Sequence, residues 1–168
     1  MSINMHSASV PVFVRLLGNL SKWIDKAEAH AQAKKFDPSV YLAARLAPDM
    51  LPFTKQVQIA CDTAKFCIAR LAGVEAPKHE DTEASLADLK ARIASTVSYL
   101  QSIPAEQVVG SDERDISVPR RDGVLVLKGE AYLKHYAHAN FYFHVTTAYA
   151  LLRHNGVELG KAVFLGRR

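Results

Sequence analysis

The chain has 168 residues, of which 49% are hydrophobic and 23% charged, with a formal net charge of +4. These values suit one globular domain over residues 1–168 and exclude extensive disorder. The cations are spread along the chain, so we expect no nucleic-acid partner. No apolar stretch is long enough to cross a membrane and the N-terminus does not resemble a signal peptide, which predicts a cytoplasmic protein.

The first predicted helix begins at Ser9, its expected N-cap, and ends near Ala33. Pro11 falls in the first turn, where its missing N–H costs nothing. Apolar residues at spacings of three and four then place one face of this helix against a core. Residues 36–39 form a turn, and residues 40–47 form a connector.

The second predicted helix starts in the segment marked by Pro48, Asp49 and Pro52, since proline is tolerated only in a first helical turn. It ends at Gly73, a residue type that favours helix C-termini. Its apolar residues recur at alternating spacings of four and three, which is typical of a helix-packing seam. They are Phe53, Val57, Ala60, Ala64, Cys67 and Leu71.

A polar linker, residues 74–81, leads to a third helix that we expect Thr82 to cap and that runs to about Gln101. Residues 108–127 differ in character, because two β-like runs flank Asp122–Gly123, a hairpin turn signal. This segment is predicted to be a small β-hairpin or an extended crossover loop.

The fourth and longest helix is predicted over residues 129–154, and Asn155–Gly156 ends it. The tail, residues 157–168, contains apolar side chains and is expected to dock as a coil. Four long helices, with one stretched connection between the third and the fourth, predict an all-α up-down four-helix bundle.

The candidate site comes from polar residues on the seam of the fourth helix. That seam places Asn140 and His144 on the stripe that should face the core, and burying such groups without partners costs roughly 1–3 kcal/mol each. Asp49 and Gln56 of the second helix are the candidate partners. Together these groups could hold a metal, a water or a ligand, or form a closed hydrogen-bond network. Asp49 has the further alternative of an N-cap.

Several segments resemble an uncharacterised family of small bacterial proteins within the DinB/YfiT-like superfamily of four-helix bundles. The resemblance covers nearly the whole chain and is most specific at residues 140–161 (NFYFHVTTAYALLRHNGVELGK). Residues 9–13 (SVPVF), 45–50 (RLAPDM) and 164–166 (FLG) add to it.

The resemblance implies an up-down bundle, often a homodimer, and often a divalent metal held by three histidines. Better-known members are thiol-dependent transferases and isomerases. The last-helix histidine pair of the superfamily falls on Asn140 and His144, and the second helix offers Asp49 and no histidine at its start. The triad is therefore not intact, and the cofactor is unknown. The corresponding metal site would consist of Asp49, Asn140 and His144, in which harder oxygen ligands replace two of the histidines.

Two functions follow. The first is an enzyme or a binding protein for a metal or small-molecule ligand, with its site between the second and fourth helices. There His144 would be a metal ligand or general base, Asn140 would orient the substrate, and Asp49 would fix the imidazole tautomer. The second is a non-catalytic homodimeric module whose polar core residues set register. An open pocket reaching His144 favours the first function, and a closed network favours the second.

Overall fold

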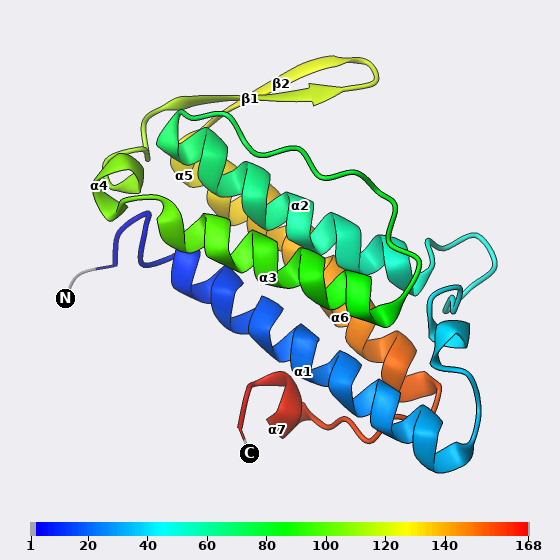
Figure 1. The fold of residues 1–168 in the computed structure, drawn as a ribbon. Coiled ribbons are helices and arrows are strands. Elements are labelled where there is room, and N and C mark those ends of the chain that lie inside the picture. The colour runs from blue at the N-terminus through cyan, green and yellow to red at the C-terminus, as the bar shows by residue number, and fades with distance from the viewer. Residues whose placement is uncertain (1–2, 168) are drawn as a thin grey trace.

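The computed structural model describes residues 3–167 and is mostly helical, with one small antiparallel sheet. Four long helices, α1, α2, α3 and α6, lie side by side (Figure 1). The elements in chain order are α1 (Val10–Lys34), η1 (Pro38–Tyr41), α2 (Phe53–Ala72), α3 (Leu86–Ser102), α4 (Ala105–Val108), β1 (Asp115–Arg120), β2 (Gly123–Lys128), α5 (Gly129–Ala131), η2 (Tyr132–Ala137), α6 (His138–His154) and α7 (Lys161–Phe164).

The up-down prediction required the four long helices to alternate in direction, and they do not. The linker between α2 and α3 runs back along α2, so that its Asp81 and Glu83 bond to Lys55 and Gln58 near the start of α2. As a result α2 and α3 run in the same direction (Figure 1). The return is feasible because α2 is about 30 Å long, and an extended chain covers roughly 3.3 Å per residue.

The helix starts differ from prediction at three caps. Ser9 lies at the N-cap of α1, but its hydroxyl donates to the Met5 carbonyl at 2.6 Å and does not cap. Helix α2 begins after Pro52, and Asp49 lies in the exposed turn before it. Helix α3 is capped by Ser85, which accepts from the Asp88 backbone N–H at 3.1 Å. Thr82 does not cap the helix because the next residue, Glu83, bonds to Gln58 and Arg92 and keeps this part of the chain in the linker. A cap preference reflects only local sequence and does not include such contacts.

The β-hairpin is confirmed. Strands β1 and β2 pair antiparallel from Asp115 opposite Lys128 to Arg120 opposite Gly123. Ile116 and Val118 are buried beneath the hairpin, whereas Val124 and Val126 of β2 are exposed. A lone hairpin is marginal in water, so β1 needs the helices under it for stability.

The C-terminal tail docks on α1, as predicted from its apolar residues, but Lys161–Phe164 form the short helix α7 where a coil was expected. The Phe164 ring of α7 stacks on Trp23 with centroids 5.3 Å apart, and the Asn19 amide donates to the Phe164 carbonyl at 3.0 Å. Among residues 3–167, no helix combines the length and the apolar character that a membrane span requires.

Candidate functional site

The buried face of the fourth long helix is displaced from the predicted stripe. Segment η2 is a π-helix, whose hydrogen bonds join residues five apart, so it holds more residues per turn than the α-helix that follows. Beyond it the core face centres on Phe141, Val145 and Ala148. Asn140 and His144 therefore lie at the edge of that face, and both are only half-buried.

His144 joins the predicted partner Gln56 and not Asp49. Its Nδ1 lies 2.7 Å from Gln56 Oε1, and the Gln56 amide donates to the Leu51 carbonyl at 2.9 Å. Since an amide oxygen accepts, the Nδ1 of His144 carries the proton. This short chain of bonds ties the segment before α2 to α6, and no described cavity includes His144 among its lining residues.

The structure does not fit the three-histidine metal site that is common in the superfamily. Residues 3–167 hold no group of three or more His, Cys, Asp and Glu side chains placed to bind a metal, so a three-histidine type of site does not fit. The mixed set of Asp49, Asn140 and His144 stays a prediction. In the described part of the chain, no hydrogen bond joins Asp49 to either of the others, and the Asn140 amide donates to the Tyr136 carbonyl at 2.8 Å.

A cavity of about 270 Å³ lies between α2, β1, η2 and α6, and Asn140 is part of its wall. The cavity lies between the two helices where the sequence predicts a site, but it is one turn before His144 and does not include that residue. The site itself stays a prediction. The other lining residues are Ile59, Asp62, Thr63, Phe66, Arg70, Val118, Pro119, Tyr132 and Tyr136.

Arg70, in the last turn of α2, is the principal cation of this cavity. Its Nη1 donates to the Tyr132 hydroxyl at 3.0 Å. Its guanidinium carbon lies 5.3 Å from the Phe66 ring centroid and 5.9 Å from that of Tyr132. Burial raises the pKa of Tyr132 to about 12, so the hydroxyl keeps its proton at neutral pH and can donate it into the cavity.

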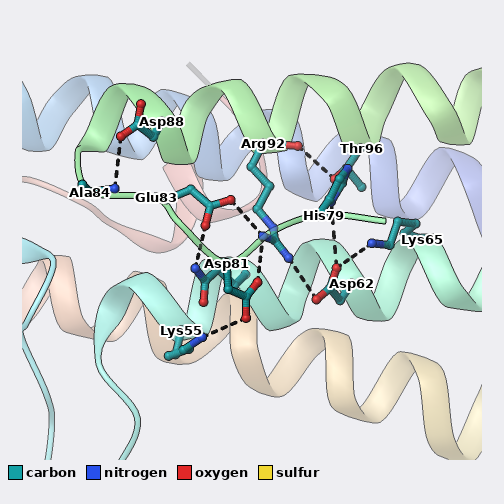
Figure 2. Close-up of polar contacts among 11 residues, drawn as sticks. Lys55, Asp62, Lys65, His79, Asp81, Glu83, Ala84, Asp88, Arg92 and Thr96 are labelled. Carbon is teal, nitrogen blue, oxygen red and sulfur yellow. Dashed lines mark hydrogen bonds and ion pairs between the residues drawn. The ribbon is translucent and has the colours of Figure 1, made fainter. Parts of the chain in front are cut away.

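Behind the cavity wall, Asp62 belongs to a polar cluster that fixes the α2–α3 linker (Figure 2). The guanidinium of Arg92 is almost fully buried and contacts Asp62 at 2.9 Å, Asp81 at 3.0 Å and Glu83 at 2.8 Å. The buried ammonium of Lys65 adds a second cation 2.9 Å from Asp62. Burial opposes ionisation of Glu83, but hydrogen bonds from Arg92 and Gln58 hold its pKa below the ordinary value. These contacts hold the linker against α2 and α3.

None of Arg70, Tyr132 and Tyr136 was assigned to a site from the sequence. The available signal was that Tyr132, Tyr136 and Asn140 recur every fourth residue, which places neighbouring side chains on one side of a helix. The cluster around Arg92 also had a signal, because Arg92 directly precedes the core residue Ile93.

Residues 5–165 match the family described as domain of unknown function DUF1993. The chain belongs to this family. As a DUF1993 protein it is also similar to a solved structure, a DinB family member protein from Shewanella denitrificans, with 46% identity and a TM-score of 0.91. The match covers 97% of this chain and 92% of that one. No curated protein gives a significant match.

The stability of this DUF1993 protein should fall as the pH is lowered from about 7 towards 5. Burial lowers the folded-state pKa of His79, His138 and His144 below the ordinary 6.5. The unfolded chain therefore binds protons first as the pH falls through 6.5, which favours unfolding until the folded-state pKa values are reached. Urea denaturation at pH 7.5, 6 and 5 measures this slope.

The matched variants for that measurement are His144→Gln and His135→Gln. The first removes one titrating group but retains a donor for Gln56, so it should reduce the slope. His135 is exposed, and its replacement should leave the slope unchanged. A free energy of unfolding that stays constant from pH 7.5 to 5 would contradict the prediction.

Proposed function

We propose that this protein binds a small organic molecule in the cavity between α2 and α6. The observation that supports it is the unused hydrogen-bonding capacity of the wall: Arg70, Tyr132 and Asn140 all retain donors that no neighbour accepts among the described hydrogen bonds. Ligand sites are typically apolar pockets with a few convergent polar groups of this kind. A π-helical segment beside the cavity adds support, because such segments are frequent at functional sites.

Filling the cavity tests the proposal. Thr63 lies in the wall, so Thr63→Phe should occupy the space of a ligand, whereas Ser95→Phe changes an exposed residue of α3 and is the control. A mixed set of neutral, cationic and anionic fragments is screened by ligand-observed NMR. We expect hits that bind the parent and Ser95→Phe but not Thr63→Phe. Hits that bind all three proteins equally, or no hits at all, would reject the cavity as the site.

A second candidate function is that of a homodimeric module, favoured by an apolar groove on α6. The groove has a volume of about 570 Å³, and its wall carries no charged residue. Phe143 is 56% exposed in it and Tyr142 40% exposed. A second copy of the chain is the occupant we propose, since an uncharged patch can meet itself across a two-fold axis without repulsion. The other lining residues are Leu46, Met50, Ala139, Thr146, Thr147 and Ala150.

Sedimentation velocity across micromolar concentrations tests the dimer. Phe143→Asp should shift the parent dimer to monomer, because it would bury a carboxylate in the interface. Val124→Asp introduces the same charge at a position that is 64% exposed on the hairpin, and it should leave the dimer intact. A monomeric parent at about 100 µM, roughly the range of weak specific contacts, would remove this function.

A further inference from the structure

A stacked column of aromatic rings and guanidinium groups forms one side of the cavity. Arg70 lies against the rings of Phe66 and Tyr132. The Tyr132 ring in turn stacks on Tyr136, with centroids 5.7 Å apart and planes 21° from parallel. Arg120 of β1 ends the column, with its guanidinium carbon 5.7 Å from the Tyr136 centroid. The column therefore contains two guanidinium groups, of which Arg70 lines the cavity.

Arg70 differs in its partners from the buried cations Arg92 and Lys65. Arg92 contacts three carboxylates and Lys65 contacts one, whereas none of the ion pairs formed within residues 3–167 includes Arg70. A guanidinium has five N–H donors, and its described hydrogen bond to Tyr132 uses one nitrogen. The remaining donors form the planar fork that suits an oxyanion with two oxygens.

The acidic residue in the wall does not supply that oxyanion. Asp62 places its Oδ1 2.9 Å from Lys65 and its Oδ2 2.9 Å from Arg92, so both of its oxygens face cations on the far side of the wall. Its charge is therefore already compensated, and it offers no free carboxylate for an ammonium group.

The cavity lining also includes the apolar residues Ile59, Val118 and Pro119. The cavity volume of about 270 Å³ lies just under the range of roughly 300–1,000 Å³ that is typical of drug-sized ligands. A ligand of this site is therefore compact, and its body is flat enough to lie beside the rings of Tyr132 and Tyr136.

We propose that the cavity binds small aromatic monocarboxylates, with the carboxylate on the fork of Arg70 and the ring among Tyr136, Val118 and Pro119. This inference rests on the proposed function, since it names the class of ligand for the same cavity. The Tyr132 hydroxyl, which accepts from Arg70, donates a hydrogen bond to one carboxylate oxygen. Asn140 lies one turn further along the wall, and its amide meets a polar substituent on the ring.

The test compares benzoate, its neutral analogue benzamide and the cation benzylamine, by chemical-shift titration of the full chain. We expect benzoate to bind at least about tenfold more tightly than the other two, because a fork-to-carboxylate pair is among the stronger hydrogen-bonded contacts. Arg70→Met should weaken benzoate by about tenfold or more, and Arg70→Lys should restore only part of the loss. Arg153→Met removes an exposed cation of α6 and should change nothing.

The outcomes separate the ligand class from the cavity itself. Benzamide or benzylamine binding as well as benzoate, or undiminished benzoate binding by folded Arg70→Met, overturns the carboxylate assignment. If Thr63→Phe still abolishes that binding, the proposed function stands. Shift changes outside the cavity, unaffected by Thr63→Phe, overturn both. Circular dichroism of each variant tests whether a loss of binding comes from unfolding.

Discussion

Replacing Arg92 by methionine should destabilise the protein by about 3 kcal/mol. Removing one partner of a buried ion pair leaves uncompensated charge and typically costs about 3–5 kcal/mol. Here three carboxylates lose their shared cation (Figure 2). The lower end of that range applies because Asp81 is half-exposed and regains water when the linker lifts. Urea denaturation measures the change in the free energy of unfolding.

The matched control is Lys90→Met. Lys90 also pairs with two carboxylates, Asp25 and Glu28, but all three groups are substantially exposed. Exposed pairs contribute roughly 0–1 kcal/mol, so this variant should remain close to the parent. A loss below about 1 kcal/mol for Arg92→Met would show that the cluster does not hold the linker. Adding Glu83→Gln to Arg92→Met should recover part of the loss, since it removes one unpaired charge.

Gly129→Ala should be the other strongly destabilising change, by about 3 kcal/mol. A Cβ built on Gly129 would lie 1.9 Å from the Ser111 backbone oxygen and 2.9 Å from the Ser111 carbonyl carbon. Both obstacles are backbone, so a side-chain rotation cannot relieve the contact. The next residue, Glu130, donates its N–H to the Asp112 carbonyl at 3.0 Å, which holds the two segments together. Overpacking of this kind costs typically 1–3 kcal/mol, occasionally more.

Gly18→Ala is the control for that change, because the added carbon meets no heavy atom within 4 Å in the middle of α1. Alanine favours a helix interior over glycine by about 0.5–1 kcal/mol, so this variant should be more stable than the parent. Melting curves of the two variants should therefore shift in opposite directions. A Gly129→Ala protein as stable as the parent would mean that the close approach of Ser111 can relax.

The loss of stability in Arg92→Met should be local as well as global. The linker, residues 73–85, has no secondary structure of its own, and its acidic residues bond to Lys55, Gln58 and Arg92. Without the Arg92 contacts it becomes a segment of low local stability, and such segments exchange amide protons fastest. Exchange that accelerates more in this linker than in the helices would identify Arg92 as its anchor.

Local patterns in the sequence were sufficient for the four long helices and for one of the two alternatives given for residues 108–127. The spacing of apolar residues predicts the long helices, and Asp122–Gly123 between two β-like runs predicts the hairpin that the structure contains. Of the two partners predicted for His144, the structure pairs it with Gln56 and not with Asp49. Gln56 lies near the seam of α2, which brings it close to a polar group on the facing helix.

The tertiary structure alone decided the direction of α3, the phase of α6 and the make-up of the cavity. The direction depends on contacts of Arg92 with Asp62, Asp81 and Glu83, which no helical periodicity encodes. The phase depends on the wide turn of η2, which moves Asn140 and His144 from the centre of the buried face to its edge. The cavity depends on packing between segments, because Arg70, Tyr132 and Asn140 come from α2, η2 and α6.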